Sequence, residues 1–192
     1  MTKILTKEER EFADKFGLSE EQRQALFDIR RYIEENPELA ETTTIFAFEG
    51  LGTFLTEEER CDEDGWNGWN SYHPNGQFGA MLIVTKEGKL SYAETRASTL
   101  PDNLDESATV KEGIYAVVPI AHKKDDEDRY VALQLRDKNN INNSALPAYN
   151  SQNEDKMTII GDNLHMAGKI TSDIPEFSEG CITVAIDGYR NF

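Results

Sequence analysis

The stretch that decides the fold is AMLIVTKEGKLSYA, which spans residues 80–93. It contains two runs rich in apolar side chains, 80–84 and 89–93, on either side of the dipeptide Glu87-Gly88. Two such runs joined by a short turn that contains glycine are typical of a β-hairpin. We therefore predict two antiparallel strands here.

Similar runs continue toward the C-terminus. They lie at residues 113–118, 130–135, 157–160, 164–166 and 181–186. Residues 137–155, in contrast, are rich in Asn, Ser and Asp, which predicts a long surface loop. The strand-like runs together predict a mostly antiparallel β domain over residues 78–192, and no internal repeat is visible.

The N-terminal part carries helix signals instead. Thr6 and Ser19 each begin a capping box, in which Ser or Thr is followed three residues later by Glu or Gln. Gly17 predicts the end of the first helix. The second helix has apolar residues at helical spacing between positions 25 and 33, and it should end before Pro37.

These patterns divide the chain into three parts. We predict a helical accessory segment over residues 1–60, a linker over 61–77 and a β-rich domain over 78–192, which makes the fold class α+β. The linker is rich in Gly, Asn and Asp and contains Trp66 and Trp69. The two tryptophans suit either a seam between the parts or stacking on a sugar ring.

Composition excludes several classes of function. The chain has 192 residues and a formal net charge of −16, so its surface should repel nucleic acid and anionic membranes. It has no apolar run long enough to span a membrane. Cys61 and Cys181 lack the spacing of a metal pair, and the three histidines form no zinc motif. We expect no metal and no cofactor.

The candidate site is SEGCITV over residues 178–184, with His165 upstream. A cysteine that follows glycine and opens an apolar run sits where a turn enters a strand. Cys181 would be the nucleophile and His165 its base, while nearby backbone amides would stabilise an oxyanion. The alternative is a buried structural cysteine and an incidental histidine.

This pattern resembles the signature of the L,D-transpeptidase catalytic domain. That family carries a histidine, a gap of about this length, and then Ser/Thr-x-Gly-Cys followed by an aliphatic residue. The resemblance implies that Cys181 is the nucleophile, His165 the base, Gly180 part of the oxyanion hole and Ser178 the motif Ser/Thr that contacts substrate. It is carried by the chain from His165 onward. Residues 78–165 match only as a compatible strand pattern, and residues 1–77 do not match.

Three positions depart from the family pattern. Glu179 stands where the family often has His, Met166 where it often has Gly, and Thr183 where it often has Arg or Asn. The departures imply a divergent member whose contacts with substrate differ from those of the family.

The resemblance implies an enzyme that acts on a peptidoglycan stem peptide or muropeptide. A thioester would form with release of D-alanine, and an amine (transpeptidation) or water (carboxypeptidase action) would resolve it. The first residues lack a secretory signal, so a cell-wall substrate implies non-classical export to the periplasm or cell wall, release by a phage, or recycling of wall fragments in the cytoplasm. Two other readings stay open: a non-catalytic phage or cell-surface binding module that keeps the fold, and a thiol hydrolase of another amide.

A second polar cluster lies at the end of a predicted strand. It comprises Arg96, Ser98 and Thr99, just before Pro101. We predict that these residues, with His122 after the next strand, line a substrate cleft, because loops converge at strand ends. The alternative is an ordinary exit from a strand and a solvated histidine.

Overall fold

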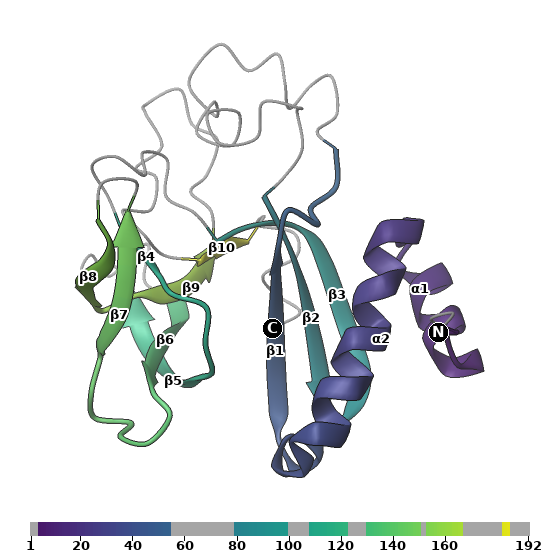
Figure 1. Cartoon of the computed structure of the whole chain (residues 1–192), viewed down its shortest axis with the longest axis horizontal. Coiled ribbons are helices and arrows are strands. Elements are labelled where there is room, and N and C mark those ends of the chain that lie inside the picture. The colour runs from purple at the N-terminus through teal and green to yellow at the C-terminus, as the bar shows by residue number, and fades with distance from the viewer. Residues whose placement is uncertain are drawn as a thin grey trace.

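The computed structural model describes residues 4–54, 79–99, 108–122, 130–150, 153–166 and 182–184. Two α-helices precede a set of strands that pair mostly antiparallel (Figure 1). The predicted α+β class is therefore confirmed. The predicted linker over 61–77, with Trp66 and Trp69, lies outside the described residues.

Helix α1 covers Lys7–Lys15 and begins at the predicted capping box. The Thr6 hydroxyl accepts from the Glu9 amide at 3.2 Å, and the Glu9 carboxylate accepts from the Thr6 amide at 2.7 Å. Gly17 follows the helix with a φ of +64°, a left-handed conformation that glycine adopts without strain. The predicted start and stop of this helix are both confirmed.

Helix α2 covers Glu20–Glu35 and begins at the second capping box, formed by Ser19 and Gln22. Its buried face includes Ala25, Leu26 and Ile29, which have the predicted helical spacing. A short 3₁₀ helix, η1 (Pro37–Glu41), follows. Pro37 cannot continue the hydrogen-bond ladder of α2, so the helix ends before it as predicted.

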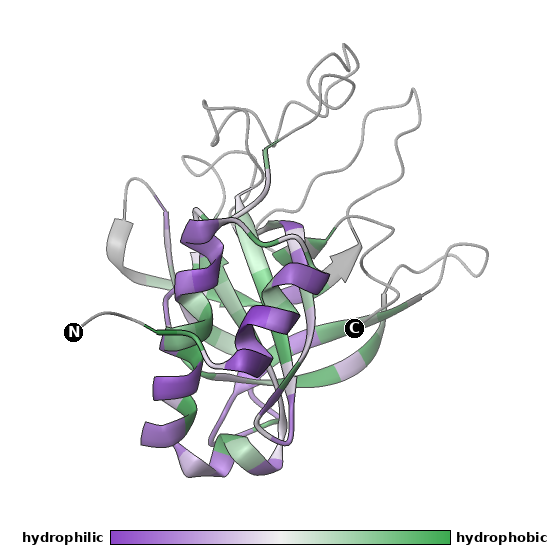
Figure 2. Ribbon diagram, turned by 90° about the vertical axis from the view of Figure 1, so that its right-hand side faces the viewer, coloured by the Kyte–Doolittle hydropathy of each residue, from purple (hydrophilic) through white to green (hydrophobic). Residues whose placement is uncertain are grey.

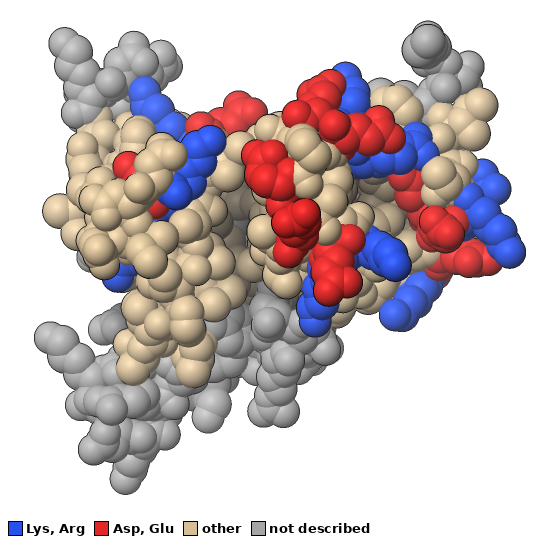
Figure 3. All heavy atoms as spheres, turned by 90° about the horizontal axis from the view of Figure 1, so that it is seen from below, with Lys and Arg blue, Asp and Glu red and all other residues tan. Residues whose placement is uncertain are grey.

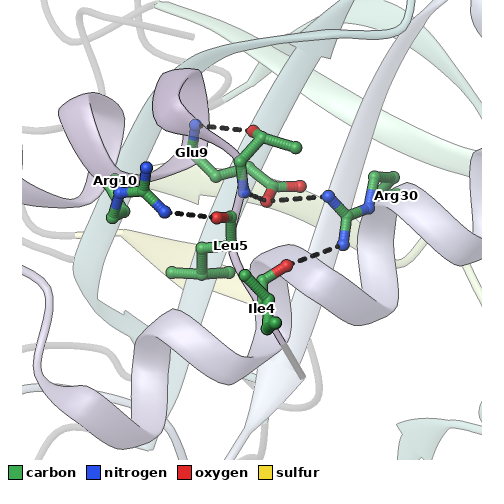
Figure 4. A network of polar contacts seen from close by, with 6 residues as sticks. Ile4, Leu5, Glu9, Arg10 and Arg30 are labelled. Carbon is green, nitrogen blue, oxygen red and sulfur yellow. Dashed lines mark hydrogen bonds and ion pairs between the residues drawn. The ribbon is translucent and has the colours of Figure 1, made fainter. Parts of the chain in front are cut away.

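An ionic network ties the two helices and the N-terminal residues together (Figure 4). The Glu9 side chain is 8% exposed and lies 3.2 Å from Nη1 of Arg30 on α2. Nη2 of Arg30 donates to the carbonyl of Ile4 at 3.2 Å, and Nη1 of Arg10 donates to the carbonyl of Leu5 at 2.6 Å. Because Glu9 also holds the cap of α1, the network couples the start of α1 to α2.

The larger sheet has seven strands in the order β1-β2-β3-β10-β9-β6-β5. Neighbouring strands are antiparallel except for β9 and β10, which are parallel. Their bounds are β1 Thr43–Glu49, β2 Ala80–Lys86, β3 Lys89–Ser98, β10 Ile182–Val184, β9 Asn163–Met166, β6 Tyr130–Asp137 and β5 Tyr115–His122.

Strand β1 corrects one prediction. Residues 1–60 were predicted to be helical, but residues 43–49 form a strand whose Phe46 pairs with Ile83 of β2. The segment TTIFAF begins with three β-branched residues and then alternates phenylalanine with alanine, which suits a pleated strand. Pairing with the buried strand β2 therefore outweighs the helical character of the sequence before it.

The smaller sheet corrects a second prediction. Its strands are β4 (Thr109–Val110), β7 (Ala145–Asn150) and β8 (Asn153–Ile160), in the order β4-β7-β8. Strands β7 and β8 occupy much of the stretch 137–155 that was predicted as a loop. In β7, Leu146 and Ala148 are buried while Pro147 between them is exposed, so a strand alternation exists beneath the polar composition.

The hairpin of β2 and β3 is confirmed. Its two turn residues, Glu87 and Gly88, both have positive φ angles, of 50° and 72°. Two left-handed residues are what the preferred two-residue hairpin turns require. The turn packs on η1, since a Cβ on Gly88 would lie 3.2 Å from the Cα of Ala40, and the Glu87 amide donates to the Thr42 carbonyl at 3.0 Å.

Two clusters of buried residues meet at β2. The first joins the helices to the sheet and contains Phe12, Ala13, Leu18, Ala25, Leu26, Ile29, Met81, Ile83 and Ala93. The second contains Ala80, Leu82, Ala97, Leu164 and Val184. Alternate residues of β2 thus face different cores. Figure 2 shows the hydrophobic strands behind helices whose outer faces are hydrophilic.

Candidate functional site

Strand β10 brings the predicted site segments into one row of the sheet. Thr183 of β10 pairs with His165 of the parallel strand β9 and, on its other side, with Ser98 of the antiparallel strand β3. Figure 1 shows β10 bridging the two halves of the molecule. Paired strands lie about 4.8 Å apart, so the backbones of Ser98 and His165 are roughly 10 Å apart with Thr183 between them.

The rows on either side of this one are fixed by the second core. Leu164, Val184 and Ala97, which neighbour the row in sequence, are 2%, 0% and 0% exposed. Ile182 pairs with Leu164, and Cys181 is the residue that directly precedes Ile182. The backbone of His165 and the strand that follows Cys181 are therefore held by the same buried residues.

Several predicted site residues lie wholly or partly outside the described structure. Cys181, Gly180 and Ser178 fall outside the described residues. The structure describes only the backbone of His165 and Ser98. What it establishes is the backbone row formed by Ser98, Thr183 and His165.

His122 lies outside this row. It is the last residue of β5, where it pairs with Tyr130, and β5 is an edge strand of the larger sheet. Strand β6 separates β5 from β9, so the backbone of His122 is about 10 Å from β9 across the sheet alone. The predicted cleft thus draws on Arg96, Ser98 and Thr99 more directly than on His122.

Thr99 leaves the sheet immediately after the row. Its carbonyl accepts from the hydroxyl of Thr109 at 2.7 Å, which links β3 to the smaller sheet. Within the described part of the chain, the Thr99 hydroxyl is buried and has no hydrogen-bond partner.

Arg96 is held by a carboxylate that the sequence analysis did not single out. Glu94 is 5% exposed, and its Oε1 accepts from the Arg96 amide at 2.9 Å and lies 3.5 Å from Nε of Arg96. Its Oε2 accepts from the Tyr92 hydroxyl at 3.0 Å. The only signal in the sequence is the spacing of two between these three residues, which is ordinary in a strand.

A second buried carboxylate lies just before β9. Asp162 is 1% exposed, and its carbonyl accepts from the amide of Leu135 at 2.8 Å. Burial, and to a lesser extent the charge of Asp162, raises the pKa of Tyr115 above its ordinary value. The Tyr115 hydroxyl donates to the Lys111 carbonyl at 2.6 Å, which favours the neutral phenol.

The described residues show neither a metal cluster nor a membrane span. No group of three or more His, Cys, Asp or Glu side chains among them is placed to hold a metal ion. No helix in these ranges is both long and apolar enough to cross a bilayer. Viewed from below, Asp and Glu side chains gather over the centre and right of the surface, with Lys and Arg side chains among them (Figure 3). With a net charge of −16, the chain as a whole repels an anionic ligand at long range.

Comparisons with protein-family models, with curated proteins and with solved structures find no match to this chain. The resemblance to the L,D-transpeptidase domain therefore depends on the motif residues and on the strand pattern around them.

Proposed function

We propose that this chain is a divergent L,D-transpeptidase-like cysteine enzyme that acts on peptidoglycan stem peptides through a thioester. One observation carries the proposal. Thr183, which lies two positions after Cys181 of the motif Ser-x-Gly-Cys, pairs with His165. Cys181 directly precedes β10, the strand that pairs with the strand of His165, and this supports a short path between the proposed nucleophile and its base.

In the proposed reaction, His165 takes the proton of the Cys181 thiol. The thiolate attacks the carbonyl carbon of the L-centre in the L,D peptide bond, and the amides of Gly180 and Cys181 stabilise the oxyanion. The intermediate collapses, the C–N bond breaks, and His165 returns the proton to the amine of the leaving D-alanine. An amine or water then attacks the thioester and restores the thiol.

We further propose that the strands from residue 78 onward form an L,D-transpeptidase-like catalytic domain. The mostly antiparallel pairing and the position of β10 between β3 and β9 support this arrangement. The helices cover the β2–β3 part of the sheet through the first buried cluster, which supports an accessory and structural role for them. None of the proposed catalytic residues belongs to the helices.

Intact mass spectrometry tests the proposal. After incubation with a tetrapeptide muropeptide, the protein should gain the mass of the acyl donor less D-alanine, and Cys181→Ala should gain nothing. Cys61→Ala is the matched control and should still form the adduct. No adduct with any stem peptide would favour the binding-module reading.

Thiol reactivity tests the same assignment without substrate. Cys61 lies among acidic residues, which disfavour its thiolate, whereas Cys181 has His165 as a candidate base. Cys181 should therefore react faster with iodoacetamide below about pH 8, where an unperturbed thiol is mostly protonated. His165→Ala should reduce the advantage, and equal rates at the two cysteines would contradict the proposal.

A further inference from the structure

We propose that Arg96 binds a carboxylate of the peptide substrate and that the buried Glu94 is the positioning residue that holds its guanidinium group. The inference depends on the proposed function for the identity of the ligand, an anionic peptide. Beyond the proposed function, it names the chemical group of the ligand that is recognised, a carboxylate. It also assigns Glu94 a role that it performs through Arg96.

The first step of the argument is the burial of Glu94. Its side chain is 6% exposed, whereas that of Arg96 is 36% exposed. A buried carboxylate is costly to desolvate, and a buried ion pair often stabilises a fold no better than apolar residues of similar size. Glu94 therefore needs a reason other than stability, and holding a more exposed arginine in one orientation is such a reason.

The second step is the geometry around Glu94. One carboxylate oxygen accepts from the Arg96 amide at 2.9 Å and lies 3.5 Å from Nε of the same residue, while the other accepts from Tyr92. Both oxygens are thus engaged. The contact with Glu94 is made by Nε, and the edge formed by Nη1 and Nη2 can bind a second carboxylate in a bidentate manner.

The third step is the place of Arg96 in the sheet. It lies two residues before Ser98, or about 7 Å along β3 from the row that contains Thr183 and His165. The register of β2 and β3 shifts between the pairs Ala80–Ala97 and Leu82–Glu94, so β3 has an extra residue at this point. Such bulges redirect side chains and are frequent beside active sites.

The fourth step is charge. The chain has a net charge of −16, so a substrate that carries carboxylates is repelled at long range. A stem peptide has carboxylates of its own, and a fixed guanidinium beside the row offsets the repulsion locally. Arginine suits this role better than lysine because its planar donors match a carboxylate.

The test compares two synthetic stem tetrapeptides, one with free carboxylates and one in which the carboxylates are carboxamides. Binding is measured by calorimetry in the Cys181→Ala background, so that turnover does not interfere. The starting protein should prefer the carboxylate peptide. Arg96→Ala should reduce that preference by roughly 10- to 100-fold, the range expected for a charge-assisted contact. Arg31→Ala removes one positive charge from an exposed site on α2 and should leave the preference unchanged.

Glu94→Gln isolates the positioning role. It keeps the size of the side chain and removes its charge, so Arg96 should lose its fixed orientation. The preference for the carboxylate peptide should fall by several-fold. Arg96→Lys should retain only part of the preference that Arg96→Ala loses. A purely structural Glu94 would change the melting temperature and leave the preference between the two peptides intact.

The outcomes separate the two proposals. Loss of preference in Arg96→Ala, together with no thioester on the protein that retains Cys181, would support the carboxylate site and overturn the enzyme. A thioester together with an unchanged preference in Arg96→Ala would support the enzyme and overturn the carboxylate site. Failure of the protein to bind either peptide would overturn both.

Discussion

The two halves of the larger sheet are built from contacts of different range. In one half, β2 and β3 form a hairpin, and α1 and α2 cover them through the first buried cluster. In the other half, β10 has three residues and holds β3 beside β9 through a few paired positions. The β2–β3 hairpin of the first half is specified by neighbours in sequence, whereas the place of β10 in the second half depends on segments that are distant in the chain. The candidate site lies in the second.

The strongest test of this difference is Cys181→Ala. If the second half carries the chemistry, turnover should fall by at least about 1000-fold, as when a catalytic nucleophile is removed. The free energy of unfolding should change little. Steady-state kinetics on a tetrapeptide and urea denaturation measure the two effects. An active Cys181→Ala protein, or one that is strongly destabilised with activity per folded molecule intact, would assign the cysteine to structure.

Two leucines in the two cores offer a sharper comparison. Leu26 of the first core is 1% exposed and Leu164 of the second is 2% exposed. Each substitution to alanine should lower the free energy of unfolding by about 2–5 kcal/mol. Activity of the folded protein should survive in Leu26→Ala and fall in Leu164→Ala, because Leu164 fixes the backbone beside His165. Equal activity in the two variants would show that the second core does not position the site.

Substitutions at the two residues of the β2–β3 turn should change stability in opposite directions, with a loss at Gly88 and a gain at Glu87. Gly88→Ala places a Cβ at a φ of 72° and 3.2 Å from Ala40, so it should cost about 1–3 kcal/mol. Glu87→Asn, at a φ of 50°, replaces a residue that resists this conformation with one that tolerates it and should stabilise by a few tenths of a kcal/mol or more. Thermal denaturation of the pair provides the measurement, and the same sign for both variants would contradict the turn geometry.

The sequence predicted elements whose signals are local. The capping boxes at Thr6 and Ser19, the stop at Gly17 and the β2–β3 turn each depend on a few adjacent residues, and all are present. Strand β1 was missed because its strand character depends on pairing with β2. Strand β7 was missed because the polar residues on either side of it mask the alternation of Leu146 and Ala148.

The candidate site, like the fold, could be predicted only where its signals are local. The motif and the upstream histidine can be identified in the sequence, and the structure adds the row that joins Thr183, His165 and Ser98. That row depends on sheet order, which no local pattern specifies. Glu94 could not be predicted because an acidic residue in a strand is usually solvated. Its burial becomes evident only with the contacts to Tyr92 and Arg96.

The smallest expected effect concerns Tyr115 on the edge strand β5 and the dependence of stability on pH. The pKa of Tyr115 is raised by burial and then by Asp162, so the folded protein retains this phenolic proton to higher pH than the unfolded chain does. The stabilisation is complete below about pH 10, the unfolded value, and is lost as the pH rises through the folded pKa.

Tyr115→Phe should be less stable than the parent near pH 8, because it loses the hydrogen bond to Lys111. The gap in free energy of unfolding between the two proteins should narrow above pH 10. Tyr149→Phe provides an independent comparison, since burial and then Glu49 raise the pKa of Tyr149. Urea denaturation from pH 8 to pH 11 measures both gaps. A Tyr115→Phe gap that widens with pH would mean that ionised Tyr115 is better accommodated in the folded protein than in the unfolded chain, contrary to its burial near Asp162.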